Sequence, residues 1–229
     1  MTSTNATYRR VYVWELPVRA FHWINGIAVA LLMATGFAIG NPVHVDMAQE
    51  ASGQYWFGAV RFVHFTAAWV FLVNFAARIY WGFAGNQYAS WKTFIPTSRG
   101  TLAEILEVLK VDIFQTRLKG HVHLGHNPLA GAIYFGTFFL FLFQVATGFA
   151  LYAPMSGSWV AKAFAWVVPL LGGDQNVRQW HHIMLWFYVL FCMVHIYLVF
   201  YHDYIEGRGT TSSMVGGWKF ERKERREGP

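Results

Sequence analysis

Charged side chains are scarce in this chain of 229 residues, and their scarcity is concentrated in four long stretches. Only 13% of the residues are charged, whereas soluble domains carry about a quarter. The longest stretches without Asp, Glu, Lys or Arg lie inside the ranges 19–46, 61–78, 119–162 and 178–203. A soluble chain of this length could not bury four such stretches on every side. This pattern excludes a soluble domain and predicts a membrane protein.

Cysteine is almost absent, and no clear signal-peptide cleavage site follows the first apolar stretch. The single cysteine, Cys192, lies inside an apolar stretch, which excludes a disulfide framework and favours a small buried side chain. The first stretch is longer than a signal-peptide core and ends in Gly36-Phe-Ala-Ile-Gly40, without a small-x-small pattern. We therefore expect this stretch to be retained as a helix.

The apolar residues that fill these stretches predict an all-α integral membrane protein with a four-helix bundle. A bilayer core about 30 Å thick requires about 20 apolar helical residues. We expect residues 1–229 to form a single membrane domain, with spans at about 18–40, 60–83, 129–153 and 180–203.

The basic residues indicate the orientation of the spans. The net charge of +6 comes from Lys and Arg before the first span, between the second and third, and after the fourth. This flanking position favours a membrane surface as the partner and argues against nucleic acid. The positive-inside rule predicts that both termini, the 84–128 connection and the 204–229 tail are cytoplasmic. Residues 101–114 have helical spacing typical of an interfacial helix, and residues 159–171 are expected to lie on the outer surface.

Five of the ten histidines fall within or at the mouth of the apolar spans: His22, His64, His181, His182 and His195. Ionisable groups in a membrane span are costly and usually functional. His181 and His195 are fourteen residues apart, which corresponds to a rise of about 21 Å along a helix. They also lie within about 40° of the same helix face. One helix therefore presents two imidazoles, too far apart to share a metal ion, and two separate centres are predicted.

The depth of each histidine predicts its partner. With the N-terminus inside, His22 and His195 lie near the inner surface, whereas His64 and His181 lie near the outer surface. Two facing histidines suit a low-spin haem b iron with no open coordination position, whereas zinc requires three or four donors. We expect two haems b, held by His64 with His181 and by His22 with His195. His182 adjoins His181 but points about 100° away, so we favour His181.

Several other residues have competing interpretations. The word Ala-Thr-Gly-Phe-Ala occurs at residues 34–38 and again at 146–150. Its glycine allows close approach of another helix, which is the simpler explanation, or of a flat ring. Arg61 and Arg78 either pair with haem propionates or extend to the membrane surface. Outside the spans lie His44, His121, His123, His126 and His202; residues 121–126 resemble a small metal cluster, but a solvated surface is the simpler interpretation.

A series of short words occurs in a fixed order along this sequence. The words, in order, are Glu15-Leu-Pro-Val-Arg-Ala-Phe-His22-Trp23, Arg61-Phe-Val-His64-Phe65, Ala77-Arg78-Ile-Tyr-Trp81, Gly85-Asn86, Gly125-His-Asn-Pro-Leu-Ala130, Thr147-Gly-Phe-Ala150, Trp180-His-His182 and Val194-His-Ile-Tyr197. Together they resemble the b-type cytochrome subunit of membrane-bound nickel–iron hydrogenases. The resemblance covers about residues 12–218, and no single word is specific without the others.

The resemblance implies a function that spacing alone does not. It implies an electron-transfer subunit in the bacterial inner membrane that does not oxidise hydrogen by itself. Its partners would be a small iron–sulphur subunit and a large nickel–iron subunit of a hydrogenase, and its electron acceptor a quinone. The family's four haem ligands correspond to His22, His64, His181 and His195. Arg178 replaces a histidine that is frequent in the family, and His202-Asp203 replaces an acidic pair.

Two other classes of protein compete with this hypothesis. The cytochrome b subunit of a formate dehydrogenase or related reductase shares the plan of four helices and two haems, but the words at 125–128 and 147–149 argue against it. A transporter with buried histidines does not explain histidines at paired depths on inward faces.

Overall fold

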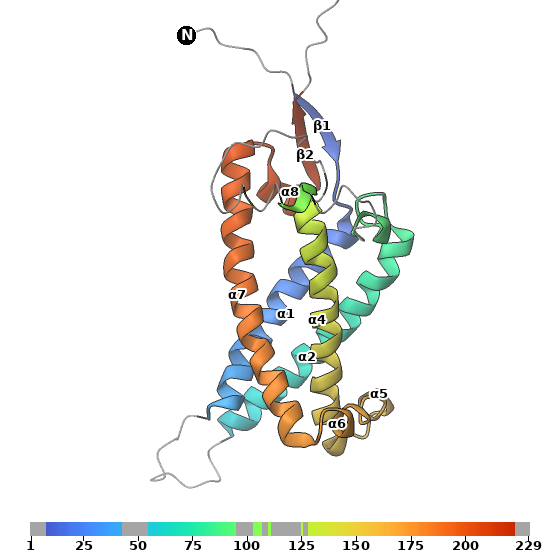
Figure 1. Cartoon of the computed structure of the whole chain (residues 1–229), viewed down its shortest axis with the longest axis vertical. Coiled ribbons are helices and arrows are strands. Elements are labelled where there is room, and N and C mark those ends of the chain that lie inside the picture. Colours follow the sequence, from blue (N-terminus) through green and yellow to red (C-terminus); the bar gives the residue numbers. More distant parts are fainter. Residues whose placement is uncertain are drawn as a thin grey trace, which may run out of the picture. The chain divides into compact units, whose positions relative to one another are not determined.

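Four long helices dominate the computed structural model of the chain, which describes residues 8–42, 55–94, 103–106, 110, 125 and 128–222 (Figure 1). They are α1 (Leu16–Gly40), α2 (Trp56–Ala84), α4 (Pro128–Tyr152) and α7 (Asp174–Glu206). The shortest have 25 residues, which corresponds to a length of about 37 Å against a hydrocarbon core of about 30 Å. All four are apolar enough to cross a membrane. The prediction of four apolar helices long enough to span a membrane is confirmed.

The fourth helix begins six residues earlier than the predicted span at 180. Gly172 and Gly173 precede it with φ angles of +82° and +113°, a backbone conformation that a side chain disfavours. Asp174 then opens the helix, and its carboxylate accepts a hydrogen bond of 2.7 Å from Arg178 one turn later. The polar first turn is helical because this ion pair and the helix dipole favour an acidic residue there, whereas the hydropathy pattern begins only at the apolar residues.

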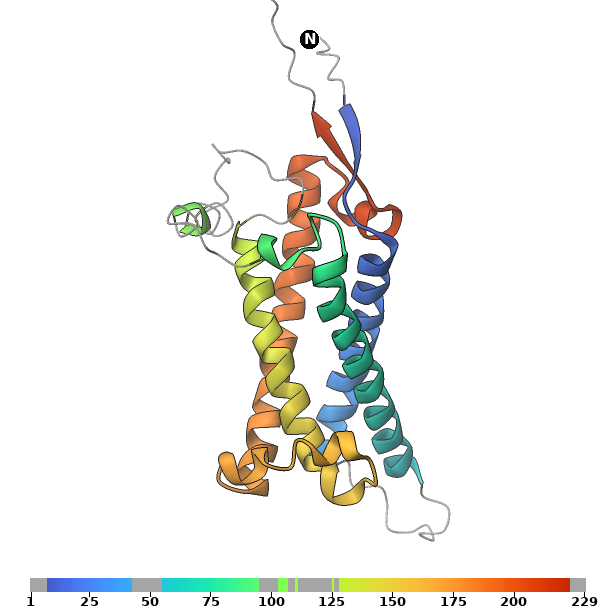
Figure 2. The same cartoon turned by 90° about the vertical axis from the view of Figure 1, so that its right-hand side faces the viewer.

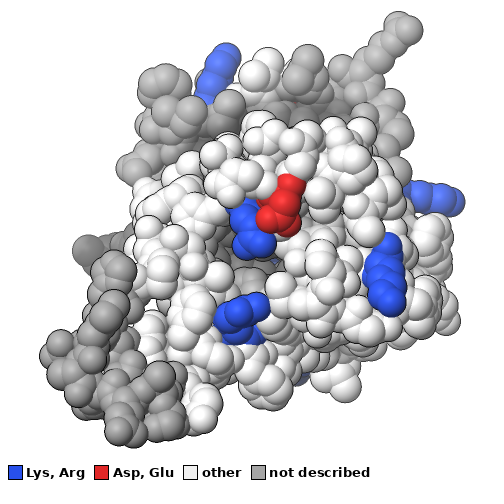
Figure 3. Space-filling view, turned by 90° about the horizontal axis from the view of Figure 1, so that it is seen from below, with Lys and Arg blue, Asp and Glu red and all other residues white. Residues whose placement is uncertain are grey.

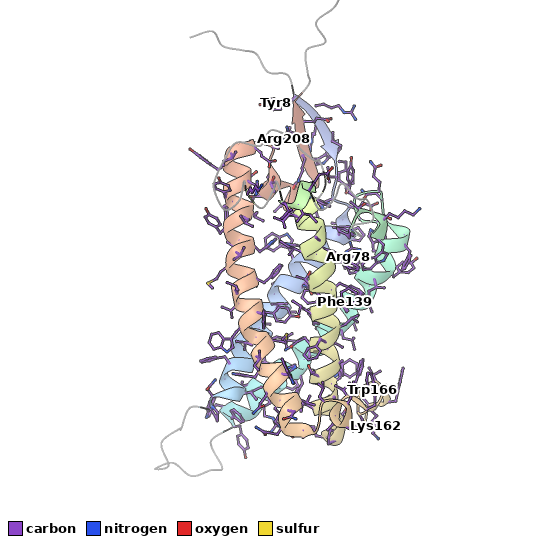
Figure 4. All side chains as sticks on the ribbon, viewed as in Figure 1. Tyr8, Arg78, Phe139, Lys162, Trp166 and Arg208 are labelled. Atoms are coloured by element: carbon purple, nitrogen blue, oxygen red, sulfur yellow. The ribbon has the colours of Figure 1, made fainter. Side chains whose placement is uncertain are left out.

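The outward faces of the long helices are apolar. Ile27 on α1, Val73 on α2, Phe139 on α4 and Leu190 on α7 are each more than half exposed, and Figure 4 labels Phe139. In water such an exposed apolar surface would be unfavourable, whereas lipid tails solvate it. The exposure pattern therefore agrees with a multi-pass membrane protein.

Two compact units make up the chain, and each long helix contributes to both. The first unit consists of residues 1–22, 78–135 and 194–229, and the second of residues 23–77 and 136–193.

In the first unit, a two-stranded sheet joins the two ends of the chain. Strand β1 (Tyr8–Tyr12) pairs antiparallel with β2 (Trp218–Arg222), from Tyr8 opposite Arg222 to Tyr12 opposite Trp218. Both views show the strands side by side next to the short helix α8 (Thr210–Gly216) (Figures 1 and 2). The sequence predicted a tail at residues 204–229, and strand β2 lies within it. We call β1, α8 and β2 together the terminal clasp.

Trp14 and Gly217 hold the terminal clasp together. The carbonyl of Gly217 accepts hydrogen bonds from the backbone N–H groups of Val13 (2.9 Å) and Trp14 (3.1 Å). The Trp14 indole donates to the Ser213 hydroxyl at 3.2 Å, and Val13, Trp14 and Ser213 are all buried. This clasp fixes the direction in which the chain enters α1.

In the second unit, aromatic side chains from three long helices form the core. Phe71 of α2 and Tyr188 of α7 both pack on Phe141 of α4, with ring centroids 5.1 and 5.7 Å apart. Trp69 meets Phe149 edge-on at 4.9 Å. Large rings fill the space between helices that lipid would otherwise enter, and they fix which helix faces lie opposite each other.

The connection between α4 and α7 contains two short helices, α5 (Trp159–Lys162) and α6 (Val167–Leu170). Neither is long enough to cross a membrane. Trp159 and Trp166 are largely exposed, and Figure 4 labels Trp166 and Lys162 in this segment. Viewed from this end, the described surface has few charged side chains (Figure 3). Exposed tryptophans beside an apolar helix are typical of a membrane interface.

Some predictions fall on residues that the structure does not describe. The helix predicted for 101–114 is one of them, although residues 103–106 within it are helical. His44, His121, His123 and His126 also lie outside the described residues.

Candidate metal centres

Two pairs of histidines face each other between the long helices, one pair in each unit. In the second unit, the imidazole centroids of His64 on α2 and His181 on α7 are 6.5 Å apart. In the first unit, those of His22 on α1 and His195 on α7 are 6.2 Å apart. The structure therefore brings together the same partners that depth and helix face predicted. Their role as iron ligands stays a prediction. We call these the outer pair (His64 and His181) and the inner pair (His22 and His195).

The distance within each pair fits a single metal ion held between two imidazoles. A bond from a histidine nitrogen to a metal is about 2 Å, and that nitrogen lies about 1 Å from the ring centroid, so two opposed ligands have centroids about 6 Å apart. The observed values of 6.5 and 6.2 Å agree with this distance. Among the described residues, no group of three or more His, Cys, Asp or Glu could hold a metal ion. The donor set suits bis-histidine haem, not zinc.

Each histidine of the outer pair contacts a threonine through Nδ1. Thr35 Oγ1 lies 2.8 Å from Nδ1 of His64, and Thr147 Oγ1 lies 2.9 Å from Nδ1 of His181. These contacts leave Nε2 of both rings as the nitrogen that can bind a metal. Neither threonine was identified as a site residue from the sequence. Their signal in the sequence is the repeated Ala-Thr-Gly-Phe-Ala word, in which each threonine directly precedes the glycine.

The glycine of the repeated word gives each imidazole of the outer pair its space. A Cβ on Gly36 would lie 3.4 Å from Cε1 of His64, and one on Gly148 would lie 3.0 Å from Cε1 of His181. The close approach that the sequence predicted at these glycines is therefore that of a histidine ring.

Two buried polar groups of the second unit have no hydrogen-bond partner among the described residues. They are Oε1 of Gln144 on α4 and the hydroxyl of Tyr188 on α7. The amide nitrogen of Gln144 lies 3.3 Å from both Nε2 and the carbonyl oxygen of His181. Tyr188 is seven residues from His181 and seven from His195, so all three lie on one face of α7. Unpaired polar groups are unfavourable in an apolar core, and here they are consistent with a cofactor site.

The remaining described histidines do not join these pairs. The ring of His182 packs on Gly40 of α1, where a Cβ would lie 2.5 Å from Cε1. Nδ1 of His202 lies 3.3 Å from a carboxylate oxygen of Glu206, one turn later on α7. Arg61 donates a hydrogen bond of 3.3 Å to the sulfur of Met155.

In the first unit, Arg78 of α2 lies in a cage of aromatic rings. Its guanidinium carbon is 5.8, 5.5 and 5.3 Å from the ring centroids of Trp91, Phe94 and Tyr134, respectively. Nη2 donates to the carbonyl of Ala89 at 3.1 Å. Figure 4 labels Arg78 on α2. Contacts of this kind stabilise a cation that is partly removed from water.

Glu15 anchors the entry to α1 against the end of α2. One of its carboxylate oxygens accepts hydrogen bonds from the Trp81 indole at 3.0 Å and from the backbone N–H of Asn86 at 2.9 Å. The Asn86 amide donates to the carbonyl of Val13 at 3.0 Å. These residues belong to the words that carry the resemblance, and in the structure they position α1, and therefore His22, from its first turn.

Comparison with known proteins agrees with the resemblance. The profile of a family described as prokaryotic cytochrome b561 matches residues 13–217. A protein of Cupriavidus necator named "Probable Ni/Fe-hydrogenase B-type cytochrome subunit" is 38% identical over 95% of this chain and 90% of its own length. A protein of the same name from Bradyrhizobium diazoefficiens is 40% identical over 90% of this chain and 85% of its own length. The "Probable Ni/Fe-hydrogenase 1 B-type cytochrome subunit" of Escherichia coli K12 is 32% identical over 91% and 90%, respectively.

Proposed function

We propose that this chain, which belongs to the prokaryotic cytochrome b561 family, is the di-haem membrane subunit of a nickel–iron hydrogenase. In this function the chain takes electrons from the iron–sulphur subunit and passes them across the membrane to a quinone. The observation that carries the proposal is the pair of facing histidines in each unit, with centroids 6.2 and 6.5 Å apart. The names of the relatives support the hydrogenase as partner.

Each pair of histidines would hold one haem b, His64 with His181 and His22 with His195. Haem b supplies a one-electron carrier there, low-spin and without an open position for oxygen when two histidines ligate it. The residues of the chain would bind and orient it, and Phe71 of α2 packs on Phe141 of α4 in the aromatic core of the unit that contains His64 and His181.

The orientation is proposed from the charge pattern. Both termini and the 84–128 connection lie in the cytoplasm and the membrane is the bacterial inner membrane. The outer pair is then on the side where the hydrogenase subunits dock, and the inner pair is near the quinone. Hydrogen oxidation itself belongs to the large nickel–iron subunit, and this chain contributes electron transfer.

A reduced-minus-oxidised spectrum of the purified chain, with haem extraction and counting, tests the proposal. We expect bands of haem b and two haems per chain. A chain without any haem band would contradict the cytochrome function. Purification together with its partner subunits separates the two candidate complexes, because a nickel-containing partner is expected for a hydrogenase. A redox partner without nickel would favour the formate dehydrogenase alternative.

A further inference from the structure

We propose that Thr35 and Thr147 are positioning residues that fix both imidazoles of the outer pair in one tautomer and thereby lower the reduction potential of the haem held there. The inference rests on the proposed function, because it assumes a haem between His64 and His181. It adds a role for two hydroxyl groups that do not themselves touch the iron.

The first step is to account for the single proton of each hydroxyl. Thr35 Oγ1 donates to the carbonyl of Leu31 at 2.6 Å, and Thr147 Oγ1 donates to the carbonyl of Phe143 at 2.8 Å. A hydroxyl has one proton to donate and two lone pairs to accept with. Because the proton is used within the helix, each oxygen is an acceptor toward its histidine. The Nδ1 atoms of both imidazoles must therefore carry their protons, and both Nε2 atoms have a free lone pair.

Gln144 supports the same tautomer of His181 independently. Its amide nitrogen lies 3.3 Å from the His181 carbonyl, which can only accept, and this contact orients the amide group. The same nitrogen lies 3.3 Å from Nε2 of His181. An amide N–H only donates, so Nε2 must be the acceptor. The lone pair that Gln144 meets in the structure is the one that a metal ion would use.

A fixed Nδ1–H···O hydrogen bond changes the chemistry of the ligand as well as its orientation. Partial withdrawal of the Nδ1 proton makes the imidazole a stronger electron donor through Nε2. Stronger donation stabilises ferric more than ferrous iron, and it lowers the reduction potential. With a threonine on each side, both histidines that would hold the outer haem act in this direction.

The same construction occurs twice, which argues against a chance contact. Each threonine is followed by the glycine that admits the histidine ring and then by a phenylalanine. Phe37 meets Trp186 edge-on at 6.3 Å and 89°, and Phe149 meets Trp69 edge-on at 4.9 Å and 89°. Trp69 is five residues after His64, and Trp186 is five residues after His181.

The repeat therefore consists of two helix pairs with matching contacts. In each pair, Ala-Thr-Gly-Phe-Ala on one helix, α1 or α4, bonds its threonine to the histidine of the next helix, α2 or α7. In each case the phenylalanine packs on the tryptophan of the other pair. The repeat therefore gives His64 and His181 equivalent hydrogen bonds on the two sides of the centre that lies between them.

Replacement of each threonine by valine and by serine tests the inference in the purified complex. Thr35→Val and Thr147→Val keep the side-chain shape and remove the acceptor, whereas Thr35→Ser and Thr147→Ser retain it. Thr66→Val on α2, which lines an apolar groove of the second unit, is the matched control. The measurements are haem content, redox titration of both haems, and electron paramagnetic resonance of the low-spin ferric centres.

We expect the outer haem of each valine variant to shift to a higher potential while the inner haem, the serine variants and Thr66→Val stay at wild-type values. Loss of the outer haem from the valine variants alone would also support the role of the hydroxyl. An unchanged outer potential with two haems bound would overturn the inference, as would equal effects of serine and valine. Both of these results leave the proposed function intact, whereas absence of haem from the wild-type chain refutes that function directly.

Discussion

Single residues determine how tightly the outer pair is held, and its two histidines differ in this respect. His181 contacts Thr147 and Gln144 and lies within 3.0 Å of the Cβ position of Gly148. His64 contacts Thr35 and has more room, because the Cβ position of Gly36 is 3.4 Å away. We infer that the His181 side of the outer centre tolerates less change than the His64 side.

Gly148→Ala should therefore disturb the outer centre. The added Cβ would lie 3.0 Å from Cε1 of His181, which is tighter than an ordinary contact, so we expect the ring to shift and its hydrogen bond to Thr147 to lengthen. We expect the haem content to fall from two toward one per chain, with the inner haem retained. The measurement is haem extraction with a redox titration of what remains.

Gly136→Ala on the same helix is the matched control for Gly148→Ala. Among the described residues, no atom outside the local helix backbone lies within 4 Å of its Cβ position, so this variant should keep both haems. If Gly148→Ala also keeps both haems at unchanged potentials, the glycine does not determine the approach of His181.

At the scale of elements, the terminal clasp depends on one backbone conformation. Gly217 has φ of +85°, and a Cβ there would lie 2.6 Å from the carbonyl oxygen of Trp14. That conformation directs β2 back along β1 and brings the Gly217 carbonyl to the N–H groups of Val13 and Trp14. A helix end followed by a left-handed glycine is a frequent way to reverse the chain.

Gly217→Ala should open the terminal clasp. A left-handed conformation costs a residue with a side chain about 1–2 kcal/mol, and the contact with the Trp14 carbonyl adds to this cost. Because 1.4 kcal/mol is a tenfold change in an equilibrium, we expect tryptic cleavage within residues 208–222 to accelerate about tenfold. Gly216→Ala should not accelerate it, because no atom of the described residues beyond the local backbone lies within 4 Å of the Gly216 Cβ position. Equal cleavage rates in both variants would contradict this account.

Lys219 of β2 gives the terminal clasp a pH dependence. Burial lowers the pKa of its ammonium group, an effect that Glu206 and Asp203 partly offset and Arg208 reinforces. Between the lowered pKa and the ordinary value of about 10.4, the opened clasp binds a proton that the closed clasp lacks. The stability of the clasp should therefore rise with pH across this window. Below the lowered pKa of Lys219, the clasp bears the full cost of burying the ammonium group.

Comparison of Lys219→Met with the wild type measures this contribution. We expect the variant clasp to resist chymotrypsin better than the wild type near neutral pH, with the difference shrinking as the pH is raised toward 10. Taking the ratio of the two cleavage rates at each pH removes the pH dependence of the protease itself. A ratio that stays constant with pH would show that Lys219 does not titrate in the clasp.

At the scale of the whole molecule, the internal repeat distinguishes the outer pair from the inner pair. Thr147 lies 112 positions after Thr35, and the same offset relates His22 to Tyr134. His181 lies 117 positions after His64, and that offset relates Arg78 to His195. The equivalent of the inner pair is therefore Arg78 with Tyr134, which also contact each other at 5.3 Å.

The repeat accounts for two centres and not three. The two histidines of the outer pair are each other's equivalents, so one centre uses both copies. The equivalent of the inner pair is Arg78 with Tyr134, a cation packed on an aromatic ring. These two side chains do not provide the two nitrogen lone pairs that a bis-histidine site offers to a metal. Each unit is thereby left with a single bis-histidine pair among its described residues.

His64→Ala tests the electron path of the assembled complex. Because His64 is a proposed ligand at the entry side, its loss should remove the outer haem and abolish hydrogen-dependent quinone reduction. Hydrogen oxidation with an artificial dye should remain largely intact, since the dye accepts electrons before they reach this chain. His182→Ala, whose ring packs on Gly40 instead, should retain both activities. Equal loss of both activities in His64→Ala would indicate that the chain serves assembly instead of electron transfer.

The amino-acid sequence by itself determined the four spans and the faces that carry histidine. Both follow from local rules, since hydropathy and charge act along the chain. The helical rise of about 1.5 Å and rotation of about 100° per residue place His181 and His195 on one helix face. The same rules predicted the partners of each pair, because the order of the spans fixes their direction.

Only the tertiary structure decided what surrounds those histidines. The contacts of Thr35 with His64 and of Thr147 with His181 join residues 29 and 34 positions apart, and they depend on how far one helix is rotated and shifted against the next. The pairing of Tyr12 with Trp218 joins the two ends of the chain, where neither segment alternates strongly enough to predict a strand. Such contacts depend on side-chain packing between distant segments, which no local pattern along the chain specifies.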